Sequence, residues 1–164
     1  MKIKLTPELA YIIGMWSTRK SWVGVGVRGL PHVCDFFIQA VIGAGLMPSS
    51  KILLSGKKAY FYHSGYKRFF SDIEREMDLR FKHKNAYSAA FVAGIFDASG
   101  RIDKNGVPIM TGIGLDKQLL IERLGFRLIK EGKYLIPSPP REFLTFIKPH
   151  SQALRSGNER DPRP

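Results

Sequence analysis

The sequence is short of acidic residues. Its 164 residues contain 14 Asp and Glu against 26 Lys and Arg, which leaves a formal net charge of +12. Because so few acids cannot pair with all of the bases, the surplus positive charge must face an anionic partner or water. In a chain this short, the excess favours nucleic acid as the partner. The alternative interpretation is a basic surface that only keeps the protein soluble.

Cysteine and long apolar runs are also scarce. The single cysteine, Cys34, cannot form an internal disulfide, which favours a reducing compartment. No apolar run reaches the roughly 18 residues that a membrane-spanning helix needs, and the first residues, MKIKLTPEL, contain no signal-peptide core. We therefore expect a cytoplasmic protein without membrane association. The four histidines lie at no metal-ligand spacing from Cys34 or from one another, so we expect no metal and no other cofactor.

What the sequence does have is two apolar helix patterns that each contain a glycine. They are YIIGMWSTRKS (11–21), with Gly14, and FVAGIFDASGRID (91–103), with Gly94. Glycine inside a helix costs about 1 kcal/mol relative to alanine, so two glycines at matched places indicate that two helix backbones cross there. They lie about half the chain apart, which indicates an internal duplication.

The segment VAGIFDASG resembles the LAGLIDADG motif of homing endonucleases and intron maturases, and IIGMWSTRK resembles a degenerate second copy. The resemblance covers about residues 5–149. It implies that the two motif helices pack together and that the eighth motif position supplies a carboxylate for the catalytic metal. That position is Arg19 in the first motif and Ser99 in the second, so both carboxylates are missing. The interpretation is a protein that has lost nuclease activity.

Two other acids lie near the second motif. Asp97 occupies the sixth motif position, where hydrogen bonding near the helix end is the expected role. Asp103 is the one candidate for a substitute metal ligand, but an aspartate in a hairpin turn usually serves the turn itself. Even if Asp103 served one side of a metal site, the other side would present Arg19.

Helix and strand signals recur in the same order in both halves. The predicted fold class is α+β: a pseudo-two-fold pair of αββαββα units with the motif helices at the interface and antiparallel, saddle-like sheets. We predict units over 1–84 and 85–149, followed by a basic tail of disorder-like composition over 150–164. The first unit has little room for its first strand, because only Arg19 to Ser21 separate the motif helix from the strand WVGVGV.

The predicted elements follow from periodicity, turn residues and helix caps. In the first unit they are a helix starting at Pro7, a strand over 22–27, a helix from Pro31, a hairpin of strands 51–54 and 59–63, and one helix over 66–81. In the second unit they are a helix over 87–98, strands over 101–102 and 107–114, a helix over 115–125, a hairpin over 126–136 and a helix over 139–148.

The central strands of both sheets are expected to turn almost bare faces outward. Trp22, Gly24, Gly26 and Arg28 alternate along one, and Pro108, Met110, Gly112 and Gly114 along the other. Reading bases in the major groove requires hydrogen-bonding side chains, which are nearly absent there. Such faces would discriminate bases poorly.

Positive charge is instead predicted at hairpin turns, helix ends and the tail. A guanidinium at Arg19 suits a backbone phosphate, and Lys20 and Arg101 are expected beside it. The predicted nucleic-acid contacts are Arg19, Lys20, Arg28, Lys51, Lys57, Lys58, Tyr60, Tyr62, Lys67, Arg68, Arg101, Lys104, Lys130, Lys133, Arg141, Arg155, Arg160 and Arg163.

Basic turns with interleaved aromatics favour structured RNA, with ribosomal RNA and ribosomal proteins as candidate partners of a monomeric protein. The alternatives are a double-stranded DNA binder or regulator on the same scaffold, and a residual LAGLIDADG endonuclease or RNA maturase.

Overall fold

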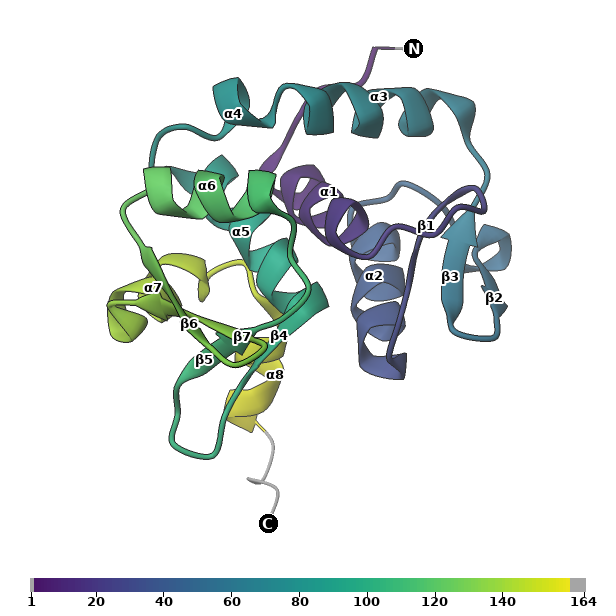
Figure 1. Ribbon diagram of the computed structural model, residues 1–164. Coiled ribbons are helices and arrows are strands. Elements are labelled where there is room, and N and C mark those ends of the chain that lie inside the picture. The colour runs from purple at the N-terminus through teal and green to yellow at the C-terminus, as the bar shows by residue number, and fades with distance from the viewer. Residues whose placement is uncertain (1, 160–164) are drawn as a thin grey trace.

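Two crossing helices lie at the centre of the molecule, α1 (Pro7–Thr18) and α5 (Ala86–Ser99), in a computed structural model that describes residues 2–159 (Figure 1). Local sequence starts both helices. The Thr6 side chain accepts a hydrogen bond from the Leu9 amide at the start of α1, and Asn85 forms a capping box at the start of α5. Nearly all of α5 is buried, in keeping with its apolar composition.

The helices cross at their glycines. A Cβ atom on Gly94 would lie 2.8 Å from the Met15 amide nitrogen and closer still to the Tyr11 carbonyl oxygen. A Cβ atom on Gly14 would overlap the Phe91 carbonyl in the same way. Each glycine therefore meets the backbone three positions before the other glycine, which is the reciprocity that a pseudo-two-fold axis requires.

The first unit forms a three-stranded antiparallel sheet in the order β1-β3-β2. The strand that the αββαββα order places directly after the motif helix, for which the sequence leaves little room, is reduced to an isolated bridge between Lys20 and Val27. After α1 the unit contains β1 (Val25–Arg28), α2 (Pro31–Gly43), a 3₁₀ turn (Ser49–Lys51), β2 (Leu53–Ser55), β3 (Lys58–Phe61), α3 (Ser64–Arg75) and α4 (Met77–Arg80).

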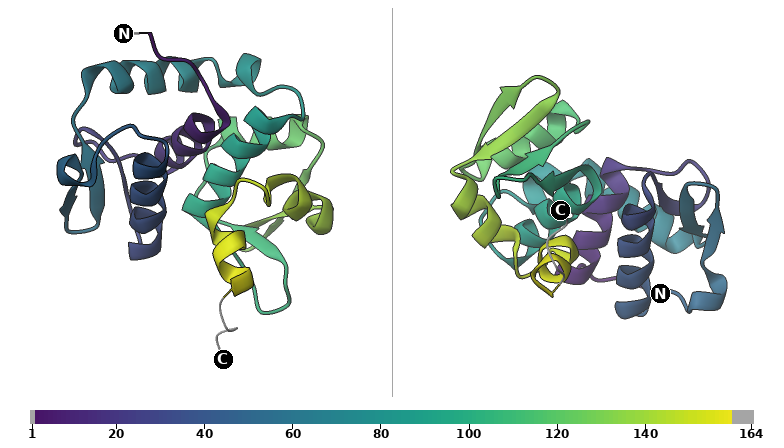
Figure 2. Two further views of the ribbon diagram at one scale, coloured as in Figure 1. Left: turned by 180° about the vertical axis from the view of Figure 1, so that it is seen from behind. Right: turned by 90° about the horizontal axis from the view of Figure 1, so that it is seen from below.

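The second unit forms a four-stranded antiparallel sheet in the order β4-β5-β7-β6. After α5 it contains β4 (Gly100–Ile102), β5 (Pro108–Met110), α6 (Leu115–Arg123), β6 (Arg127–Glu131), β7 (Tyr134–Ser138) and α7 (Pro140–Ile147). The two units lie on either side of the α1–α5 pair (Figure 2). The predicted α+β class and the αββαββα order are confirmed. The unit boundaries at 84 and 149 stay a prediction.

The single helix predicted over 66–81 is wrong, because the segment divides into α3 and α4. The break is at Glu76, whose backbone leaves the helical conformation at φ −103° and ψ 14°. The change of direction lets Phe81 enter the core, where its ring stacks on Phe91 at a centroid distance of 4.3 Å. Burial of Phe81 is therefore favoured over the single continuous helix that the apolar spacing predicts.

The predicted faces of β5 are also wrong. Met110 is fully buried, whereas the neighbouring Ile109 lines a surface cleft. Strand pairing sets this arrangement, because Met110 pairs with Gly100, which has no side chain to occupy the same space. The sequence pattern did not reveal the inversion, since all three residues of the strand are apolar and buried.

The segment after α7 was expected to resemble a disordered tail, and much of it is helical. The helix α8 (Gln152–Glu159) packs beside α1 and α5 (Figure 2). The predicted contacts Arg160 and Arg163 lie outside the described residues. Within 2–159, no helix has both the length and the apolar character needed to cross a membrane.

Candidate nucleic-acid interface

A cleft of about 380 Å³ opens where α1 and α5 end. We call it the central cleft, and it combines groups from both units. Its polar and aromatic lining includes Arg19, His32, Ser99, Arg101, Thr111, Lys133 and Tyr134. Because the eighth positions of both motifs lie here, this is the place where the resemblance would put a metal site.

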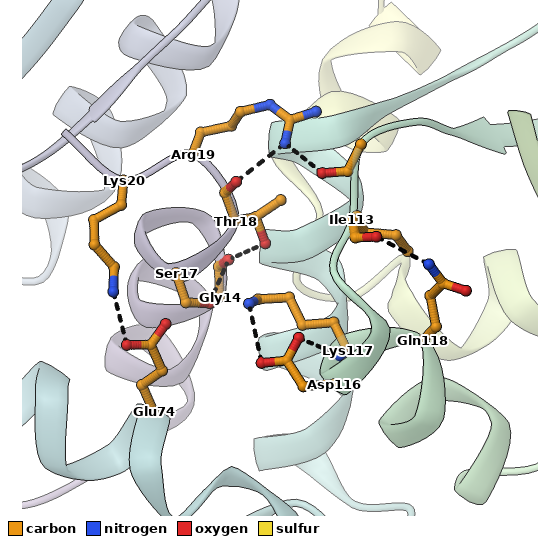
Figure 3. A network of polar contacts seen from close by, with 11 residues as sticks. Gly14, Ser17, Thr18, Arg19, Lys20, Glu74, Ile113, Asp116, Lys117 and Gln118 are labelled. Atoms are coloured by element: carbon orange, nitrogen blue, oxygen red, sulfur yellow. Dashed lines mark hydrogen bonds and ion pairs between the residues drawn. The ribbon is translucent and has the colours of Figure 1, made fainter. Parts of the chain in front are cut away.

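Arg19 ties the two units together across the end of the cleft (Figure 3). Its Nη1 donates to the carbonyls of Thr18 at 3.0 Å and Gly112 at 3.1 Å, and its Nη2 donates to the Thr111 carbonyl at 2.8 Å. Burial, and secondarily the charge of Arg28, lowers the pKa of Arg19. These bonds use three of the five guanidinium N–H groups, and Nε and one Nη2 hydrogen have no hydrogen-bond partner among residues 2–155.

The second motif presents a hydroxyl that is turned back onto its own helix. Ser99 Oγ donates to the Ile95 carbonyl at 2.6 Å. The nearby carboxylate of Asp103 accepts hydrogen bonds from the amides of Asn105 at 2.8 Å and Val107 at 2.9 Å, which fixes the β4–β5 turn. Within the described part of the chain, no group of three or more His, Cys, Asp or Glu side chains could hold a metal ion.

Two cations lie near the Tyr134 ring on the second unit's side of the cleft. The Arg101 guanidinium carbon is 6.0 Å from the centroid of the Tyr134 ring, and Lys133 Nζ is 5.5 Å from it. Cations over an aromatic face are held by the ring quadrupole and keep part of their hydration. The arrangement leaves two positive groups and an aromatic ring together at the cleft wall.

A second hollow, of about 550 Å³, adjoins the first at Arg19. We call it the Trp22 hollow. Its lining consists of Ser17, Thr18, Arg19, Lys20, Trp22, Arg28 and Gly112. The Trp22 side chain is 81% exposed, which is unusual for so large an apolar group.

Comparison with solved structures finds the homing endonuclease I-DmoI over nearly the whole chain. The match to I-DmoI in complex with DNA and calcium has a TM-score of 0.58 and covers 94% of this chain and 98% of that one, at 13% sequence identity. The match to its mesophilic variants has a TM-score of 0.53, covers 88% and 96% of the two chains and also has 13% identity. The chain has the LAGLIDADG homing-endonuclease fold. The sequence matches no protein-family model, and no curated protein matches it.

Within this LAGLIDADG fold, Lys20 does not join Arg19 and Arg101 in the central cleft as expected. Its side chain points away from Arg19 (Figure 3), and Nζ lies 2.8 Å from Glu74 Oε1 on α3. The same ammonium sits 4.2 Å from the centroid of the Trp16 ring. Residue spacing alone could not show this, because the acid that pairs with Lys20 comes from another helix.

The remaining predicted contacts are spread over the surface of the LAGLIDADG fold. Lys51, Lys57, Lys58, Tyr60 and Tyr62 belong to the β2–β3 hairpin and its flanks, whereas Lys104 lies in the β4–β5 turn and Lys130 in β6. Lys67 and Arg68 lie on α3, at the end of β3 opposite the hairpin turn (Figure 1). Arg141 is on α7, and Arg155 on α8 lines a separate pocket. Of the predicted basic contacts, the structure therefore places Arg19, Lys20, Arg28, Arg101 and Lys133 around the two hollows, and Lys20 is already paired with Glu74.

Asp97, at the sixth motif position, holds the start of α8. Its carboxylate accepts hydrogen bonds from the hydroxyls of Tyr11 and Ser151, both at 2.6 Å, and from the amides of Gln152 at 2.8 Å and Ala153 at 3.3 Å. Burial raises the pKa of Asp97, and these hydrogen bonds oppose the increase. The predicted structural role near a helix end thus extends to a helix that sequence reasoning did not predict.

Proposed function

We propose that this protein is a non-catalytic nucleic-acid-binding protein that uses the ends of its motif helices to hold phosphates. The observation that best supports this proposal is the central cleft. Arg19 and Ser99 occupy the eighth motif positions there, and Arg101 and Lys133 line the same cleft. A guanidinium repels a divalent cation and attracts a phosphate. Asp103 is engaged with backbone amides of its own turn, which further supports a binding role.

Structured RNA is the ligand that we favour, with ribosomal RNA in the cytoplasm as one candidate. An aromatic group lies beside cations at both hollows: the exposed Trp22 lines one with Arg28, and the half-buried Tyr134 lies near Lys133 at the other. Unpaired bases can stack on such groups, whereas the bases of an intact duplex are already stacked. The cations contact phosphates whatever the sequence.

The test is binding of structured RNA and duplex DNA at one salt concentration, followed by a salt titration. Arg28→Ala and Lys133→Ala should each lower the slope of log affinity against log salt by about 1. Leu79→Ala on α4 is the control, because it removes an exposed side chain that lines neither hollow. Unchanged slopes in both cation variants would contradict phosphate binding at this site.

Duplex DNA is the second candidate, and one observation favours it. Solved structures of I-DmoI, which shares this fold, include complexes with DNA. If duplex DNA binds more tightly than structured RNA at equal salt, this candidate replaces the first.

Loss of catalysis is tested separately, by incubation of both nucleic acids with Mg²⁺ or Mn²⁺. We expect no cleavage. Cleavage that Asp103→Asn abolishes would show that Asp103 binds the metal and that the protein is an enzyme.

A further inference from the structure

Trp22 is presented to solvent by a firmly anchored loop. The loop leaves α1 and folds back into β1, where the Ser21 amide donates to the Gly26 carbonyl at 3.0 Å and the Arg28 amide to the Arg19 carbonyl at 2.9 Å (Figure 1). Ser21 itself is buried. Gly24 adopts φ +60°, in a place where a Cβ atom would strike the Phe61 carbonyl. The indole is therefore exposed because the backbone holds it outward.

Three cations line the Trp22 hollow together with the indole. Arg19 and Arg28 line the same hollow, and among the side chains of residues 2–155 neither guanidinium forms an ion pair with a carboxylate. Lys20, the third cation of the lining, is already paired with Glu74. The Nε group and one Nη2 hydrogen of Arg19 remain available to an incoming acceptor.

The hollow thus combines an aromatic surface and two arginines at a place that is open to solvent. We propose that the Trp22 hollow binds one unpaired nucleotide, with its base stacked on the Trp22 ring and its phosphate held by Arg19 and Arg28. Every base has a π-face, so this site would take any base and would select for the absence of pairing. The inference rests on the proposed function, and it specifies an unpaired nucleotide as the feature of the nucleic acid that the protein recognises.

The probes are two short RNA stems of equal sequence, one fully paired and one with a single bulged 2-aminopurine nucleotide. The full-length protein should bind the bulged stem more tightly and quench the fluorescence of 2-aminopurine. Trp22→Ala should lower affinity for the bulged stem by about 5- to 150-fold and remove the quenching, and it should leave affinity for the paired stem nearly unchanged. Trp22→Phe should retain part of both effects. Leu79→Ala serves as the control for loss of an exposed apolar side chain.

Equal affinity loss on both stems, or retained bulge preference and quenching in Trp22→Ala, would overturn the inference while leaving nucleic-acid binding intact. Failure of the unmodified protein to bind any stem would overturn the proposed function and the inference with it. A DNA stem with the same bulge separates the two sources of an unpaired nucleotide. If it binds as tightly as the RNA stem, the Trp22 site stands and the preference for RNA is refuted.

Discussion

Replacing Gly94 with alanine should separate the two motif helices. The added methyl carbon would lie 2.8 Å from the Met15 amide nitrogen and closer to the Tyr11 carbonyl, whereas ordinary contacts begin at about 3.4 Å. Overpacking costs about 1–3 kcal/mol when side chains can adjust, and the upper end applies because the obstacle is backbone. Alanine's higher helix propensity offsets about 1 kcal/mol of this cost. We expect a net loss of about 2 kcal/mol in the free energy of unfolding.

Urea denaturation followed by circular dichroism measures this loss, and Gly43→Ala is the matched control. Gly43 is the last residue of α2, and no atom lies within 4 Å of a Cβ added there. Gly43→Ala should therefore keep the stability or raise it by up to about 1 kcal/mol. A Gly94→Ala variant as stable as the unmodified protein would refute the close crossing.

The double variant Gly14→Ala/Gly94→Ala tests whether both glycines serve the same contact. Either methyl group alone must push α1 away from α5, so the second should cost less once the helices have moved. The combined loss should fall short of the sum of the single losses by about 0.5 kcal/mol or more. Strict additivity would mean that the two glycines act independently.

Three further predictions concern the polar contacts around the motif helices. Arg19→Met should lower the free energy of unfolding by about 1–2 kcal/mol, measured in urea, since it removes three charge-assisted bonds at a half-buried site. Lys20→Met should leave the salt slope of nucleic-acid binding unchanged, because Glu74 already pairs with that ammonium; a slope lowered by about 1 would show that it binds phosphate. Because the folded-state pKa of Asp97 is raised, its stabilising contribution is largest below the ordinary aspartate pKa and declines as pH rises through the folded value. The stability of the unmodified protein relative to Asp97→Asn should therefore fall with increasing pH over that window, and a difference independent of pH would contradict the burial of an ionisable group.

The core of the fold could be predicted from sequence because its signals are local. The mid-helix glycines required a backbone crossing, and the short connection after Arg19 left no room for a full strand. The errors arose where distant contacts decide the conformation. The break at Glu76 depends on Phe81 reaching Phe91, and the helix α8 depends on the buried carboxylate of Asp97.

The candidate site was predictable in part for the same reason. The eighth motif positions placed Arg19 and Ser99 at the helix ends, and the sequence identified a basic surface near them. It did not reveal that Lys20 pairs with Glu74, because that acid comes from another helix. Tyr134 was missed although it directly follows Lys133 in a hairpin, a signal that an aromatic lies beside a cation.

Most of the groups available to a ligand lie beside the eighth motif positions rather than at them. Most of the Arg19 donors and the Ser99 hydroxyl are bound to the protein's own carbonyls. What remains is Trp22, Arg28 and two N–H groups of Arg19 on the first unit, and Arg101 and Lys133 on the second. Binding by groups on two units depends on the distance between those units.

The α1–α5 crossing sets that distance, so the stability and the binding predictions are connected through Gly94. An alanine there touches no ligand, yet it should displace the first unit's contacts from those of the second by up to about 1 Å. Misplaced contacts bind poorly even when each one is present. We therefore expect Gly94→Ala, assayed at a temperature where it remains folded, to weaken binding more than Arg28→Ala does. A variant that binds as tightly as the unmodified protein would show that each unit binds nucleic acid independently.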